Sequence, residues 1–137
     1  MAVTQSKAWT YTTGGYPAAL RLSSITPPSK NDVKANHILV KIQSAALNPV
    51  DIQIMNLFAW SIPLPMLTAE KTMCSDFSGK VLQGGEGSGF SAGDEVFGVA
   101  MKPFNPCGGT LSEVADLDLS STCVAKKKND WSFAIHC

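Results

Sequence analysis

The segment 36–47, NHILVKIQSAAL, constrains the fold more than any other part of the chain, because its side chains alternate with a period of two. One face carries Ile38 and Val40, and the other carries Leu39 and Lys41. This is the period of a β-strand, whose successive side chains point to opposite faces of a sheet. The segment therefore predicts a strand with one side turned toward a core.

Shorter apolar runs bounded by glycine and proline predict further strands, and the segment 49–56 predicts one short helix. The additional strands are expected at residues 7–12, 18–24, 76–83, 94–100, 108–118 and 121–127. Six or seven short strands with one helical turn favour a β-barrel or sandwich over an alternating β/α sheet. Because 137 residues normally form one core, we expect a single mainly β domain over residues 1–137.

The composition excludes several classes of protein. Hydrophobic residues make up 45% of the chain and charged residues only 16%, which excludes a disordered chain. Eleven basic and eleven acidic residues cancel, so we expect neither a nucleic-acid partner nor attraction to a membrane surface. The lysines at 126–128 are interpreted as a solvated turn. No signal peptide or membrane-spanning segment is evident, so we expect a cytoplasmic protein.

A metal site is not predicted. Zinc requires three or four converging ligands, whereas this sequence has no Cys-x-x-Cys pair and no histidine at ligand spacing from a cysteine. We interpret the cysteines as reduced thiols. The residues considered are Cys74, Cys107, Cys123, Cys137, His37 and His136.

Polar residues interrupt the apolar run at Asn48-Pro49, where the predicted helix begins. Asparagine before proline is typical of a helix N-cap, and proline suits the first helical turn. Asp51 would then lie in that turn, where its charge complements the helix dipole. This predicts a helix cap from Asn48 and a first-turn acid from Asp51.

A glycine-rich link, residues 84–93, contains a match to the dinucleotide-binding pattern G-x-G-x-x-A at 87–92. That pattern requires a helix directly after it, so that the helix N-terminus faces the pyrophosphate. The following segment, 94–100, has the pattern of a strand instead. We therefore predict a hairpin connection without phosphate binding.

Four motifs occur in order along the chain: AALNPVDIQ at 45–53, DFSGKV at 76–81, GDEVFG at 93–98 and GGTLSEVADLD at 108–118. Together they resemble the N-terminal GroES-like domain of medium-chain dehydrogenase/reductases, in particular the zinc-independent quinone oxidoreductases and fungal enoyl reductases. The resemblance implies a GroES-like, partly open β-barrel with one or two short helices. It also implies that a separate Rossmann domain carries NADPH.

The resemblance assigns roles to residues of the 45–53 motif. Asn48 matches the family's asparagine beside the nicotinamide, and Asp51 matches its aspartate one helical turn on. Gln53 stands where quinone reductases usually place a tyrosine. The zinc-dependent branch would place a cysteine at position 48 and a His-Glu pair near Ser75-Asp76, and this chain has neither.

Beyond Trp131-Ser132-Phe133, where the family continues into its cofactor domain, the sequence ends. Our principal hypothesis is a stand-alone or truncated GroES-like domain, derived from an NADPH oxidoreductase of enones, quinones or enoyl thioesters. Without the Rossmann domain it would bind no cofactor of its own and would be unable to transfer hydride alone.

Two alternatives remain open. A cofactor-free cyclase or isomerase could shape an apolar polyene carbonyl substrate, with Asn48 and Gln53 as donors and Phe58 and Trp60 lining the pocket. Core packing or self-association is the plainer role of the two aromatic residues. A non-catalytic binding or oligomerisation module is the other alternative. The expected partners are a small apolar carbonyl compound and a second copy of the chain.

Overall fold

The computed structural model describes residues 5–57, 69–101 and 107–128, and within them the chain is mainly β. The elements are, in order, β1 (Ser6–Tyr11), β2 (Arg21–Ile25), the 3-10 turn η1 (Lys30–Asp32), β3 (His37–Ala46), α1 (Pro49–Leu57), β4 (Lys71–Thr72), β5 (Asp76–Gly84), β6 (Glu95–Ala100), β7 (Val114–Asp118) and β8 (Thr122–Lys126). The predicted fold class, a partly open barrel with short helices, is confirmed.

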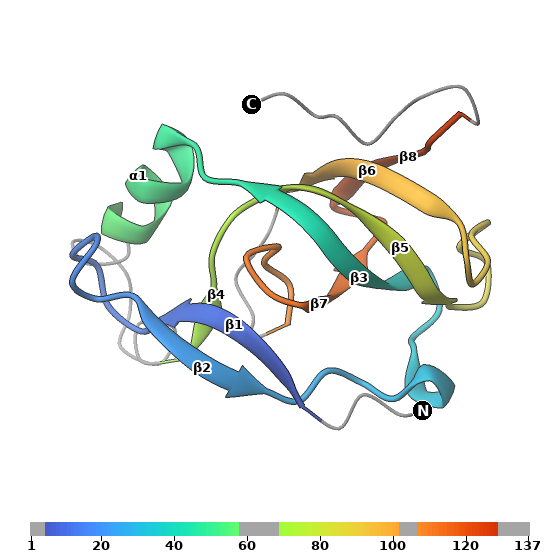
Figure 1. Ribbon diagram of the computed structural model, residues 1–137, viewed down its shortest axis with the longest axis horizontal. Helices are drawn as coiled ribbons and strands as arrows, with labels where there is room; N and C mark the ends of the chain where they lie inside the picture. The colour runs from blue at the N-terminus through green and yellow to red at the C-terminus, as the bar shows by residue number, and fades with distance from the viewer. Residues whose placement is uncertain (1–4, 58–68, 102–106, 129–137) are drawn as a thin grey trace.

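The larger sheet has five antiparallel strands in the order β7-β3-β5-β6-β8. Its strongly curved strands β3, β5 and β6 are seen edge to edge in Figure 1. This sheet holds the main hydrophobic core, to which β3 contributes Ile38 and Val40. Leu39 is not part of this core cluster, as the predicted alternation requires, but it is buried as well, so both sides of β3 are covered at this end.

The smaller sheet has the order β2-β1-β4, and β1 connects it to the larger one. An isolated bridge pairs Ala8 with Ser112, just before β7. The backbone N–H of Trp9 donates to the carbonyl of Leu111 at 3.0 Å, and that of Glu113 donates to Lys7 at 2.9 Å. These bonds join the two sheets into a barrel that is open elsewhere, as Figure 1 shows.

Helix α1 follows β3 directly and lies at one end of the molecule, near the β1–β2 turn (Figure 1). Its Met55 is fully buried in a second small core with Tyr11, Met73 and Cys74. The Oδ1 atom of Asn56 accepts a bond of 3.1 Å from the backbone N–H of Gly15 in the turn. These two contacts hold the C-terminal end of the helix against the rest of the molecule.

Most element boundaries agree with the sequence-based expectations, with three exceptions. β2 was expected over 18–24 but begins at Arg21, because residues 16–19 form a turn. The strand expected over 108–118 is shorter, because residues 109–111 bond to the segment around β4 before β7 begins. The two-residue strand β4 was not predicted. None of the described helices is long and apolar enough to cross a membrane.

Candidate functional site

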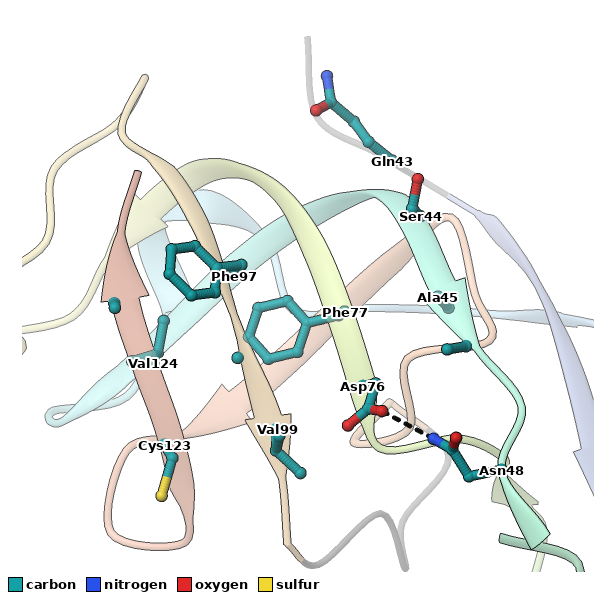
Figure 2. Close-up of a pocket in the computed structure, with 13 residues that line it drawn as sticks. Gln43, Ser44, Ala45, Asn48, Asp76, Phe77, Phe97, Val99, Cys123 and Val124 are labelled. Atoms are coloured by element: carbon teal, nitrogen blue, oxygen red, sulfur yellow. Dashed lines mark hydrogen bonds between the residues drawn. The ribbon is translucent and has the colours of Figure 1, made fainter. Parts of the chain in front are cut away.

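A pocket of about 1120 Å³ lies against the larger sheet, next to the start of α1 (Figure 2). Four strands, β3, β5, β6 and β8, supply nearly all of its walls. Its lining consists of Gln43, Ser44, Ala45, Ala46, Asn48, Asp76, Phe77, Phe97, Gly98, Val99, Cys123, Val124 and Ala125. Its volume is slightly above the range of about 300 to 1,000 Å³ that is typical of pockets for small organic ligands.

The pocket has an apolar wall and a small polar corner. Phe97, Val99 and Val124 supply aromatic and branched aliphatic surface from β6 and β8. Asn48 and Asp76 form the corner, as Figure 2 shows. Asp76 is the one charged side chain among the described residues that line the pocket. Such a lining suits an apolar ligand that carries a few hydrogen-bonding atoms.

The pairing of β3 with β5 creates the polar corner. Ala46, at the end of β3, lies opposite Asp76, the first residue of β5. Asn48 follows two residues later and turns its side chain back toward β5. Its Nδ2 atom donates a hydrogen bond of 2.7 Å to Oδ2 of Asp76, the dashed line in Figure 2. Both side chains are half-buried.

Asp51 holds the backbone of Asn48 in place at the start of α1. Its Oδ2 atom accepts a 2.8 Å bond from the backbone N–H of Asn48, and its Oδ1 atom accepts a 3.1 Å bond from the Ser75 hydroxyl. The first bond is the N3-to-N-cap half of a capping box. Asp51 is only 3% exposed, so these partners matter for keeping a carboxylate in the interior.

Two neighbouring groups are held in their neutral forms. Burial raises the pKa of the Tyr11 hydroxyl to about 12, and the charge of Asp51 adds to this effect. Burial also raises the pKa of the Cys74 thiol to about 12, with further contributions from Asp51 and Asp76. A thiol with so high a pKa is a poor nucleophile at neutral pH. Cys74 therefore serves packing.

The predicted site residues occupy different places. Asn48 lines the pocket, whereas Asp51 lies buried below it and supports Asn48. Gln53 is exposed on α1 and is not among the residues that line the pocket. Phe58 and Trp60 lie outside the described residues. The assignment of catalytic and substrate-binding roles to these five residues stays a prediction.

Sequence reasoning did not assign a role to Asp76 or to Phe97. The only signal for Asp76 was its place at the head of the DFSGKV motif, a carboxylate directly before an apolar strand. Its partner Asn48 is 28 positions away, so the contact depends on strand register. Phe97 belongs to an ordinary alternating strand sequence, so nothing in the sequence marks it as a residue that lines a pocket.

A dinucleotide cofactor needs a cradle for its pyrophosphate, and the described residues do not provide one. Gly87 and Gly89 have φ angles of +74° and +75°, as glycines in a tight turn do. They connect antiparallel β5 to β6, however, and β6 starts at Glu95 with no helix in between. Residues 85–94, which join the two strands, contain turns and no helix, so the predicted hairpin connection is confirmed.

Among the described residues, no three of the histidine, cysteine, aspartate and glutamate side chains are grouped as a metal site would require. The three cysteines within the described ranges, Cys74, Cys107 and Cys123, are free thiols.

Comparison with known proteins places this geometry in a family. Residues 34–127 match the family model described as the alcohol dehydrogenase GroES-like domain. A 2-methylene-furan-3-one reductase from Solanum lycopersicum is 37% identical over 98 residues, which cover 69% of this chain and 23% of the reductase.

Two quinone oxidoreductases are among the solved structures that are similar to this chain. The enzyme from Coxiella burnetii has a TM-score of 0.72 at 26% identity, over 94% of this chain and 39% of that one. The Escherichia coli enzyme, solved with NADPH, has a TM-score of 0.67 at 21% identity, over 93% of this chain and 35% of that one. The chain thus spans less than half the length of each of these relatives.

Proposed function

Because the chain belongs to the alcohol dehydrogenase GroES-like domain family, we propose that its pocket is the acceptor-binding wall of a zinc-independent, NADPH-dependent reductase of enones or quinones. The observation that carries this proposal is the amide–carboxylate corner beside an apolar wall in a pocket of about 1120 Å³. The names of the tomato and Coxiella relatives, a furanone reductase and a quinone oxidoreductase, agree with a carbonyl acceptor.

Asn48 is the group best placed to bind the acceptor. A primary amide has two N–H donors, and the bond to Asp76 uses one of them. The second can donate to a carbonyl oxygen, while the ring or chain of the acceptor lies against Phe97 and Val99. A donor on the carbonyl oxygen stabilises the negative charge that develops there when the conjugated double bond is reduced.

Hydride transfer itself is assigned to a nicotinamide cofactor held outside the described residues. The turn at Gly87 and Gly89 has no helix to bind a pyrophosphate. Isolated hydrogen bonds contribute about 0.5 to 1.5 kcal/mol each, against roughly 4 to 15 kcal/mol lost on immobilising a ligand. The 137-residue chain by itself should therefore neither bind NADPH tightly nor oxidise it.

Calorimetric titration of the purified chain tests both halves of the proposal. We expect measurable binding of cyclohex-2-enone and of duroquinone, and none of NADPH. Asn48→Ala should weaken enone binding by about two- to tenfold, the worth of one neutral hydrogen bond. Asn31→Ala, at an exposed position in η1, is the matched control and should leave binding unchanged. Tight NADPH binding would contradict the claim that this chain does not hold the cofactor. Failure of both acceptors to bind would contradict the claim that the pocket is an acceptor site.

The size and shape of the pocket favour a second candidate, a cofactor-free cyclase or isomerase of polyene carbonyl compounds. A volume of about 1120 Å³ exceeds what a simple enone needs, and orienting a flexible chain can accelerate an intramolecular reaction by itself. Conversion of a polyene aldehyde by the chain without NADPH, followed by chromatography, would favour this candidate over the first.

A further inference from the structure

The Asn48–Asp76 bond determines which way the amide of Asn48 faces. A carboxylate accepts hydrogen bonds and cannot donate them when ionised, so only the Nδ2 atom can lie 2.7 Å from Oδ2 of Asp76. The reversed amide would set two oxygens against each other. Asp76 therefore acts as a positioning residue, which leaves the second N–H of Asn48 as a donor beside the carboxylate.

The carboxylate also has acceptor capacity of its own. An ionised carboxylate offers about four lone-pair sites, and the Asn48 amide occupies one of them. Asp76 is half-buried, lines the pocket and lies opposite Val99 of β6. A ligand in the pocket thus meets a donor and an anionic acceptor side by side, followed by apolar surface.

The charge of the lining restricts the ligand further. Lysine, arginine and histidine are absent from the described residues that line the pocket, and Asp76 is negative. A ligand carboxylate or phosphate close to Asp76 would be repelled, and no cation in the described lining would compensate. The pocket should therefore select neutral acceptors.

From these three observations we propose that the preferred acceptors are neutral α-hydroxy enones, in which a hydroxyl and a carbonyl occupy adjacent carbons. The carbonyl accepts from Asn48 and the hydroxyl donates to Asp76, while the hydrocarbon part lies on Phe97 and Val99. The two oxygens of such a ligand are separated by a distance similar to the 2.7 Å between Nδ2 and Oδ2. This inference rests on the proposed function, because it names the substrate class of the same pocket.

The test compares three probes built on a five-membered carbocycle: two cyclopentenones, 2-hydroxy-3-methylcyclopent-2-enone and its 2-methoxy ether, and the anionic cyclopent-1-ene carboxylate. A hydrogen bond to a charged acceptor is stronger than a neutral one, so the wild-type chain should bind the hydroxy compound about tenfold more tightly than the ether. The carboxylate should bind more weakly than either. Calorimetry or ligand-observed NMR measures all three on the full 137-residue chain.

Asp76→Asn tests the assignment to this residue. The variant keeps the shape but loses the charge, so the preference for the hydroxy compound should shrink to about threefold or less, and binding of the carboxylate should improve. Glu86→Gln removes an exposed carboxylate from the β5–β6 link, away from the pocket. It should change neither the preference for the hydroxy compound nor the affinity for the carboxylate. Circular dichroism establishes that each variant is folded.

The outcomes separate this inference from the proposed function. Equal binding of the hydroxy compound and its ether by the wild-type chain would overturn the inference and leave neutral enone binding intact. An unchanged preference in folded Asp76→Asn would also overturn it. Failure of both enones to bind would contradict the inference and the proposed function together. If the Asp76 variant does not fold, the comparison of the three probes on the wild-type chain still tests the preference for α-hydroxy enones.

Discussion

Asp51 connects the start of α1 to the segment before β5, because its two carboxylate oxygens accept hydrogen bonds from different parts of the chain. The sequence predicted an acid in the first helical turn, and this is confirmed. It also predicted a cap from the side chain of Asn48. In the structure the side chain of Asn48 donates to Asp76, and its backbone N–H donates to Asp51. The local pattern located both residues, but their partners depend on tertiary contacts.

This arrangement predicts unequal effects of two substitutions. Asp51→Asn should lower the free energy of unfolding by about 1 to 3 kcal/mol, since it weakens two bonds to a buried charged acceptor. Asn48→Ala keeps the backbone bond to Asp51 and should cost about 1 kcal/mol or less. Urea denaturation measures both, with Asp32→Asn as an exposed control. A larger loss for Asn48→Ala would show that its side chain, not Asp51, secures the helix start.

The raised pKa values of Cys74 and Tyr11 predict a loss of stability at alkaline pH. The thiol titrates near 9 when unfolded and at about 12 when folded, and the hydroxyl near 10 and at about 12. Below about pH 8 both groups are protonated in both states and contribute little pH dependence. Above it the unfolded chain releases protons first, so the free energy of unfolding falls.

Denaturation at a series of pH values measures this slope. The free energy of unfolding should fall by about 1 to 2 kcal/mol between about pH 8 and pH 10. Cys74→Ala should flatten the dependence, whereas Cys123→Ala, at an exposed position, should not. A wild-type slope that survives in Cys74→Ala would refute the assignment to the buried thiol.

At the scale of elements, strands whose side chains alternate between apolar and polar were predicted well. Elements that form only through pairing with segments far away in the sequence were not. β3, β5, β6 and β8 lie within a residue or two of their expected bounds. β4 has only two residues, and pairing with β1 is what makes it a strand. Similarly, residues 109–111 fall within a strand that was expected over 108–118, but they bond to the β4 region. Neither outcome could be inferred from local propensity.

The contact between β6 and β8 gives a prediction at this scale. A Cβ atom on Gly98 would overlap the backbone carbonyl oxygen of Cys123, so Gly98→Ala must push β8 away from β6. We expect a loss of about 2 kcal/mol or more and weaker enone binding, because both strands line the pocket. Thermal and chemical denaturation, together with calorimetry, measure these effects.

Gly87→Ala is the matched control for Gly98→Ala. A Cβ atom there meets no neighbour within 4 Å, but the φ angle is +74°. Its cost should be limited to backbone strain of about 1 kcal/mol, with binding unchanged. If both variants lost equal stability and Gly98→Ala still bound the enone normally, close packing of β6 on β8 would not shape the pocket.

For the molecule as a whole, the number of short strands predicted a barrel or sandwich, and the resemblance carried by the four ordered motifs implied the partly open barrel. The pocket could not be predicted in the same way. Its walls come from strands far apart in sequence, and its corner exists because Ala46 pairs with Asp76. Gln53 was named as a candidate because it stands where the resembling reductases usually place a tyrosine. It is exposed on α1, and its role at the site stays a prediction.

Self-association is the final prediction, and exposed apolar residues around α1 support it. Val50 is 51% exposed and Leu57 is 58% exposed. They are seven positions apart, so they lie on the same face of the helix two turns from each other. Leu47, 41% exposed, lies just before the helix. Apolar faces of this kind tend to be covered by a partner, and a second copy of the chain is the partner we expect.

Light scattering coupled to size-exclusion chromatography measures the mass of the particle. The wild-type chain should elute as a dimer that dissociates on dilution, and Leu57→Lys should shift it toward the monomer, because a lysine charge is costly to bury in an apolar interface. Leu22→Lys is the matched control, since Leu22 is 57% exposed on β2 and away from the helix. A dimer broken equally by both substitutions would place the interface elsewhere, and a wild-type monomer at high concentration would rule out self-association through α1.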